Sequence, residues 1–81
     1  MSNISWGSSV RVKDVKIVEQ YGEDIAEVCG VDVIHDQARS LMFRRPLGTR
    51  VFLIEFSDGS STEVPEDLLE LWDVLATGSS A

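Results

Sequence analysis

The feature that most constrains this chain is the stretch from Val51 to Trp72, VFLIEFSDGSSTEVPEDLLELW. Both alternating sets of positions in Val51–Phe56 are apolar, which predicts a central strand covered on both faces. Asp58-Gly59 supplies the positive φ that a tight hairpin turn needs, and 60–64 then returns as a shorter, more polar strand. The stretch therefore predicts a β-hairpin at the centre of a small domain.

A helix is expected directly after this hairpin. Pro65 suits the first helical position, and the charges of Glu66 and Asp67 favour the positive end of a helix. An apolar stripe at helical spacing follows, and it comprises Leu68, Leu69, Leu71, Trp72 and Leu75. These signals predict a C-terminal amphipathic helix.

The first third of the chain shows the alternation typical of strands. Val10 and Val12 alternate with polar residues, and so do Val15 and Ile17, with the parity changing between the two pairs. Such a change predicts two short strands separated by a bulge or a break. A turn is expected at 21–24, where a glycine and two acidic residues follow a tyrosine.

The segment 25–43 admits two interpretations. The valines of 25–36 favour strands interrupted by Gly30, although Ile25 and Val28 also fit a short helical turn. Residues at i, i+4, i+7 and i+8 then fit a helix of two turns, namely Ile34, Ala38, Leu41 and Met42. A strand over 40–44 fits equally well, so both alternatives stay open.

Length and composition indicate one folded domain. A chain of 81 residues buries roughly 60 to 65% of its surface, and 43% hydrophobic residues suffice to oppose chain entropy. We expect a flexible segment over 1–8, a globular domain over 9–76 and a disordered tail over 77–81. Trp6 is expected to pack onto the sheet, with a place in an interface as the alternative.

Charge and cysteine content narrow the function classes. The formal charge is −7, which disfavours binding to phosphate backbones and favours basic partners. Cys29 is the single cysteine, so it is interpreted as a buried or half-buried apolar residue in a reducing compartment. No window is long and apolar enough for a membrane helix, and the N-terminus lacks signal-peptide features. We therefore expect a cytoplasmic protein without membrane association.

Charge is segregated along the sequence, and this is the main functional clue. The segment 37–54 holds Arg39, Arg44, Arg45 and Arg50 without an acid, whereas 55–73 holds seven acids without a base. In one interpretation the arginines form a basic patch that binds a carboxylate, a phosphate or an acidic partner. In the other they pair with the acidic half of the same domain.

The candidate binding residues are drawn from this segment and from the C-terminal stripe. They are Phe43, Arg44, Arg45 and Arg50 as a contact patch, with Trp72 as an interface anchor. Three sets suggest a catalytic or metal site: His35 beside Asp36, Cys29 with His35, and His35 with Asp32 and Asp36. His35 and Asp36 would point to opposite faces of a strand, Cys29 is flanked by acids instead of cations, and the metal set has no ligand-spacing signature. No catalytic residue, metal site or cofactor is therefore predicted.

The two ends of the chain resemble small SH3-like barrel domains. The similar stretches are GSSVRVKD, VFLIEFSDG and TEVPEDLLEL, with Gly7, Val10, Val12, Leu53, Glu55, Phe56, Asp58, Gly59, Asp67, Leu68 and Leu69 at the matching positions. The resemblance implies a barrel with a helical turn before its last strand, of a kind common in bacterial domains. The middle, 22–48, lacks the Gly-x-Gly-x-Val strand of such barrels.

The predicted fold class is therefore mainly β or α+β, a small antiparallel sheet or SH3-like barrel with a C-terminal amphipathic helix. The expected function is a small acidic protein-interaction module or accessory protein without catalytic activity, which binds a protein partner or itself. One alternative is an acidic mimic of nucleic acid that inhibits a DNA-binding protein. Another is a small-ligand binder that uses the arginine patch.

Overall fold

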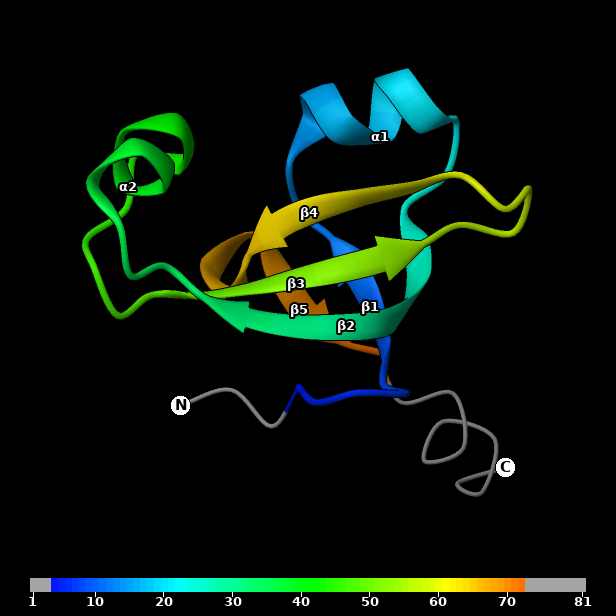
Figure 1. The fold of residues 1–81 in the computed structure, drawn as a ribbon. Helices are drawn as coiled ribbons and strands as arrows, with labels where there is room; N and C mark the ends of the chain where they lie inside the picture. Colours follow the sequence, from blue (N-terminus) through cyan, green and yellow to red (C-terminus); the bar gives the residue numbers. More distant parts are fainter. Residues whose placement is uncertain (1–3, 73–81) are drawn as a thin grey trace.

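The computed structural model describes residues 4–72, which form one antiparallel sheet with two short helices. The elements in chain order are β1 (Ser9–Val12), α1 (Val15–Tyr21), β2 (Ile25–Val33), α2 (Gln37–Phe43), β3 (Arg50–Glu55), β4 (Ser61–Pro65), the 3-10 turn η1 (Glu66–Leu68) and β5 (Leu69–Leu71) (Figure 1). The strand order is β4-β3-β2-β1-β5 with every pairing antiparallel, and the sheet is not closed into a barrel. The predicted class, a small antiparallel sheet of mainly β or α+β type, is confirmed.

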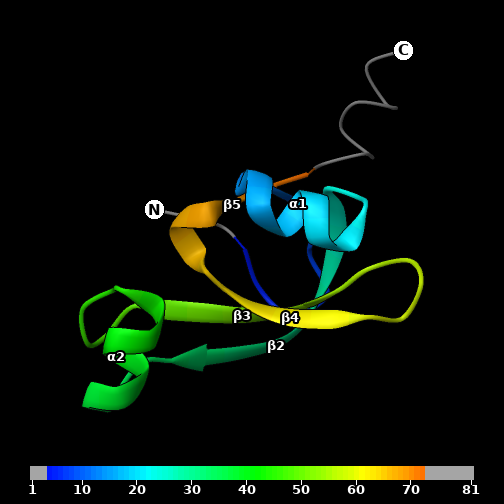
Figure 2. The same ribbon diagram turned by 90° about the horizontal axis from the view of Figure 1, so that it is seen from above.

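The core lies on one face of this sheet. Its buried side chains are Ile4, Val10, Val12, Ala26, Val28, Phe52, Ile54, Phe56, Val64 and Leu69. Helix α1 lies against the core behind the β2-β3-β4 layer, whereas α2 lies beyond the ends of β2 and β3 (Figure 2). Tyr21 of α1 stacks on Phe56 with ring centroids 4.7 Å apart, which fixes the helix to the sheet.

The predicted hairpin is present. Strand β3 pairs with β4 across a turn in which Gly59 has φ 88°, and the Phe56 amide donates to the Ser60 carbonyl at 2.8 Å. Phe52 and Ile54 are fully buried, while Leu53 on the opposite face is 36% exposed. The strand is central, as expected, but its second face is only partly covered.

Residues 15–21 form a helix, so the prediction of a second strand at Val15 and Ile17 is wrong. The Asp14 carboxylate caps the helix by accepting from the Lys16 amide at 2.9 Å, and Gly22 ends it with φ 80°. Ile17, Val18 and Tyr21 then meet the core from one helical face. Capping and helical spacing together outweigh the short alternation.

The structure settles both alternatives for 25–43. Residues 25–33 form one strand, and its register with β3 shifts between Val28 and Gly30, which places Cys29 in a bulge. A Cβ at Gly30 would lie 3.2 Å from the Leu53 Cβ, so glycine permits the close approach of β3. Residues 37–43 form a helix, with the Asp36 carboxylate accepting from the Arg39 amide at 2.8 Å.

The helix expected after Pro65 does not form over the described residues. Residues 66–68 make one 3-10 turn, and 69–71 then pair with β1 as strand β5. The physical reason is the edge of β1, with which 69–71 pair and where Leu69 joins the core cluster at 4% exposure. Leu75, the last position of the expected stripe, lies outside the described residues.

Two expectations about single side chains are also wrong. Trp6 is 73% exposed and does not pack onto the sheet, and Cys29 is exposed because it lies in the bulge. Within the N-terminal segment, residues 5–8 form a turn after Ile4, whose side chain is 2% exposed in the core. The expectations for 1–3 and 73–81 lie outside the described residues.

Candidate functional site

Two of the predicted patch arginines are held by acids of the same domain. Arg45 binds Asp67 with two hydrogen bonds, Nε to Oδ1 and Nη2 to Oδ2, both at 2.7 Å. Arg50 lies 3.2 Å from Glu66, donates to the Ile4 carbonyl at 2.8 Å and covers the Phe52 ring at 5.0 Å. Both guanidiniums therefore fix the α2–β3 loop and the start of β3 to η1.

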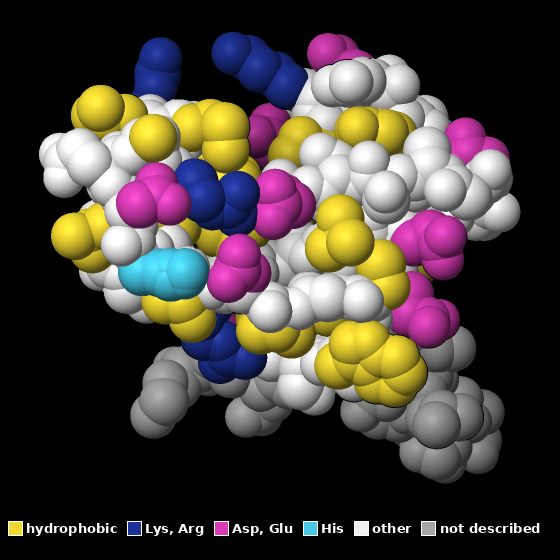
Figure 3. Space-filling model, in the orientation of Figure 1, with side chains coloured by type: hydrophobic (Ala, Val, Ile, Leu, Met, Phe, Trp, Pro, Cys, Tyr) yellow, Lys and Arg dark blue, Asp and Glu magenta, His cyan; other side chains and the backbone are white. Residues whose placement is uncertain are grey.

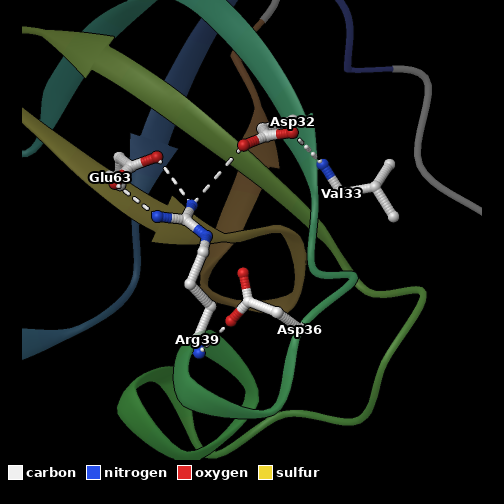
Figure 4. A network of polar contacts seen from close by, with 5 residues as sticks. All are labelled: Asp32, Val33, Asp36, Arg39 and Glu63. Carbon is white, nitrogen blue, oxygen red and sulfur yellow. Dashed lines mark hydrogen bonds and ion pairs between the residues drawn. The ribbon is translucent and has the colours of Figure 1, made fainter.

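A third arginine, Arg39 of α2, contacts acids on two strands of the sheet. Its Nη2 lies 2.9 Å from Glu63 on β4 and 3.7 Å from Asp32 on β2, so its guanidinium bridges strands on either side of β3 (Figure 4). The hydrogen bond to Glu63 raises the pKa of Arg39 above its ordinary value. The same guanidinium lies 5.2 Å from the Phe43 ring centroid, which ties the two ends of the helix together.

These contacts favour the second interpretation of the charge segregation, in which the arginines pair within the domain. We call Arg39–Glu63, Arg45–Asp67 and Arg50–Glu66 the ion-pair set. Arg44 is the exception: it is exposed at the C-cap of α2 with φ 56°, and no acid pairs with it within residues 4–72. Three of the four arginines in 37–54 are therefore engaged with acids of the same domain.

The five predicted binding residues do not form one surface. Phe43, Arg44 and Arg45 lie together at the end of α2, and Arg50 joins Arg45 only through neighbouring acids of η1. Trp72 follows β5, where its amide donates to the Ser9 carbonyl of β1 at 2.9 Å, and its side chain is 41% exposed. It is thus placed beside β1, away from the contacts of the arginines.

The most exposed apolar side chains near the patch lie on α2 and its following loop. We call this set, Ala38, Leu41, Met42 and Leu47, the α2 surface. Leu41 is 70%, Met42 62% and Leu47 56% exposed, and no residue of α2 is buried. The three helical members lie on one face at i, i+3 and i+4. In the space-filling view, apolar side chains gather over α2 and its loop, next to a band of charged ones (Figure 3).

Sequence reasoning missed this surface, although its signal was present. The spacing of Ala38, Leu41 and Met42 indicated an amphipathic helix, and such a stripe ordinarily packs on a core. The pattern does not show that the helix lies beyond the ends of β2 and β3, where no part of residues 4–72 buries the stripe.

A hollow of about 480 Å³ lies at the other end of the sheet. It is lined by Ser9, Glu23, Ile25, Ala26, Glu27, Glu55, Phe56 and Ser57. Glu23 is engaged there, since its carboxylate accepts from the amide and the hydroxyl of Ser57 at 2.9 and 2.8 Å. Glu27 and Glu55 are direct cross-strand partners in the β2–β3 pairing, and neither has an ion-pair partner within 4–72. None of the patch arginines lines this hollow.

Replacing Glu55 with lysine should stabilise the protein. Like charges directly opposite each other on neighbouring strands repel, and an opposite pair contributes roughly 0.2 to 1 kcal/mol. We expect Glu55→Lys to raise the free energy of unfolding in urea by about 0.5 to 1 kcal/mol, with a gain that shrinks as salt increases. Glu55→Gln, which only removes the repulsion, should give about half of this gain; a loss of stability in both variants would contradict the facing-carboxylate geometry.

The Arg45–Asp67 pair should make stability depend on pH. Hydrogen bonding to Arg45 lowers the pKa of Asp67 below its ordinary value of 3.8, so the folded state binds this proton less readily than the unfolded state. The stabilisation is therefore present above about pH 4 and lost as pH falls through the lowered pKa. Asp67→Asn should weaken the acid-induced fall of the urea midpoint.

The partner variant provides the control. Arg45→Gln removes the same interaction from the other side, so the double variant should show no further loss of pH dependence. Additive effects of the two substitutions would mean that Asp67 owes its lowered pKa to another group.

The catalytic and metal alternatives gain no support from the geometry. Cys29 and His35 are both exposed, and no hydrogen bond joins them in the part of the chain described. Across 4–72 no three histidine, cysteine, aspartate or glutamate side chains come together in a way that could hold a metal ion. The helices described are also too short to span a membrane.

Comparison with known protein families, with curated proteins and with solved structures found no match for this chain.

Proposed function

We propose that the protein is a small acidic interaction module without catalytic activity, which docks a protein partner on the α2 surface. The observation that carries this proposal is a well-anchored helix that buries none of its own residues. Leu41 and Met42 point their apolar groups into solvent at 70% and 62% exposure. An apolar set of this kind, beside charged groups, is typical of protein interaction sites.

The way α2 is held strengthens the proposal. A helix of seven residues is unstable alone in water, so its order depends on contacts with the rest of the domain. Polar contacts contribute to this: Arg39 binds Glu63 and Asp32, and the Ser40 hydroxyl donates to the Arg45 carbonyl of the following loop at 2.6 Å. The domain thus anchors α2 through its polar side and leaves the apolar side accessible.

The chemistry of the surface indicates the kind of partner. Leucine and methionine supply an adaptable apolar contact, and a flexible thioether suits a groove of irregular shape. Arg44 lies at the edge of the α2 surface without an acid partner in the described chain, so a carboxylate of the partner would complement it. The expected partner has an apolar groove with an acidic residue at its rim.

The two alternative functions receive less support. Six acidic residues are engaged in ion pairs with Arg11, Arg39, Arg45 and Arg50, which removes them from any phosphate-like array; they are Asp24, Asp32, Glu63, Glu66, Asp67 and Glu70. For the small-ligand alternative, Arg45 and Arg50 already bind Asp67 and Glu66, and the hollow touches neither arginine.

Affinity capture with matched variants tests the proposal. Wild type, Leu41→Asp and Val15→Asp serve as baits, because Leu41 and Val15 are aliphatic residues of short helices with similar exposures of 70% and 67%. We expect a protein whose recovery falls about tenfold or more with Leu41→Asp and is unchanged with Val15→Asp. Equal recovery with both variants would contradict the proposal, and light scattering on the wild type shows whether the partner is a second copy.

A further inference from the structure

Strand β2 has a free edge over its second half. Strand β1 covers residues 25–27, and the Val28 amide still donates to the Ser8 carbonyl at 2.8 Å. The chain before β1 then turns away: Gly7 has φ 87°, and the Ser8 amide donates to the Ser5 carbonyl at 3.0 Å. Beyond Cys29, β2 has β3 on one side and, among the residues described, no strand on the other (Figure 1).

The register shows which backbone groups face this edge. The Ile34 amide donates to the Thr49 carbonyl at 2.9 Å, and hydrogen-bonded and non-hydrogen-bonded positions alternate along an antiparallel pair. Asp32 therefore shares hydrogen bonds with β3, whereas Val31 and Val33 direct their backbone groups outward. The Val33 amide confirms this direction, because it donates to the Asp32 Oδ1 at 2.8 Å instead of to β3.

The side chains along the edge alternate in character. Val31 is 46% and Val33 41% exposed on the face that carries the core. Asp32 points to the other face, where its second oxygen lies 3.7 Å from Arg39 while the first accepts from Val33 (Figure 4). The edge thus presents an apolar, an acidic and an apolar residue in turn.

We propose that the edge Val31–Val33 is a docking strand for an extended segment of another protein with an apolar–basic–apolar sequence. In antiparallel pairing centred on Asp32, the central residue of the partner lies opposite this carboxylate, where lysine or arginine is favourable. Its two apolar neighbours meet Val31 and Val33 on the core side. The net charge of −7 attracts the same basic class of partner.

Asp32 determines what can pair with this edge. A second copy of the chain in the same register would place Asp32 against Asp32, and like charges directly opposite each other are destabilising. The Asp32 carboxylate also accepts the hydrogen bond of the Val33 amide. A docking strand must therefore offer a carbonyl that replaces this carboxylate oxygen as the acceptor. A basic partner gains from both features, since its cation binds the released carboxylate while its carbonyl accepts from Val33.

The experiment is an NMR titration of the full chain with two synthetic peptides. One is Ser-Thr-Thr-Val-Lys-Val-Thr-Thr-Ser, and the other has glutamate in place of its lysine. We expect the amide signals of Val31 and Val33 to shift more than those of Gly30 and Asp32, and the lysine peptide to bind about fivefold tighter. No shift at Val31 and Val33 at millimolar peptide, or equal binding of both peptides, would overturn the proposal.

Variants separate the edge from the rest of the molecule. Asp32→Lys should reverse the order of the two peptides, while Glu55→Lys, which changes the net charge equally on β3, should preserve it. Leu41→Asp should leave peptide binding unchanged, because this inference does not rest on the α2 surface. A preserved order in Asp32→Lys, with the spectrum of a folded protein, would also overturn the proposal.

Discussion

Replacing Phe52 with alanine should remove most of the stability of the protein. Phe52 lies in the middle of β3, is 0% exposed and also supports Arg50 through the face of its ring at 5.0 Å. Truncation of a buried phenylalanine costs about 3 to 5 kcal/mol, because transfer free energy is lost and a cavity remains. A domain of 81 residues lies near the lower end of the usual range of about 5 to 15 kcal/mol.

The neighbouring residue is the matched control. Leu53 follows Phe52 in the same strand but lies on the opposite face at 36% exposure, so Leu53→Ala should cost about 1 kcal/mol. Urea unfolding followed by far-ultraviolet circular dichroism measures both costs; tryptophan fluorescence suits less well because Trp6 is exposed. Equal costs at the two positions would contradict the assignment of the core to one face of the sheet.

Replacing Arg39 with alanine should release α2 while the sheet stays folded. The substitution removes the bridge to Glu63 and Asp32 and the contact with the Phe43 ring, yet alanine is the best helix former. Any loss of helix in this variant is therefore due to the lost contacts of Arg39 and not to a lower helix propensity. We expect amide hydrogen exchange over 37–43 to rise to within about tenfold of a free peptide, while exchange in β3 is unchanged.

Arg44→Asn is the control for this prediction. It removes the same charge five residues away, its side chain has no acid partner in the described chain, and asparagine tolerates the left-handed backbone at φ 56°. Exchange over 37–43 should stay close to wild type in this variant. If Arg39→Ala exchanged no faster than Arg44→Asn, the ion-pair set would not be what holds α2.

The centre of the fold could be predicted because its signals are local. Asp58-Gly59 determines the turn, and the apolar run of Val51–Phe56 indicates the strand before it, so the hairpin follows from neighbouring residues alone. The two caps of α1 are local as well. The alternation of Val15 and Ile17 predicts a strand instead, although Asp14 and Gly22 flank the helix at capping positions.

The C-terminal element could not be predicted in the same way, because a distant strand determines it. The stripe after Pro65 fits a helix locally, but β1 offers an edge on which Leu69 becomes buried. Tertiary pairing of this kind overrides helical spacing. Local periodicity does not show which strand edges remain free once β1 and β2 have paired.

In the candidate site, too, local sequence predicts one part and contacts between distant residues determine the other. The separation of arginines and acids along the sequence predicted two alternatives, ion pairs within the domain or a basic patch. In the structure Arg39, Arg45 and Arg50 pair with acids of β4 and η1. The partners are 24, 22 and 16 residues away in sequence, so spacing alone does not assign them. The α2 surface depends in turn on where these pairs hold the helix.

A photo-crosslinking residue at position 41 tests the docking surface most directly. Benzoylphenylalanine replaces Leu41 in one variant and Val15 in the other, and both are irradiated in cells of the source organism. The proposed function predicts a covalent adduct of one discrete mass from position 41 that is absent from position 15. No adduct at position 41, or the same adducts at both positions, would contradict a partner site on α2.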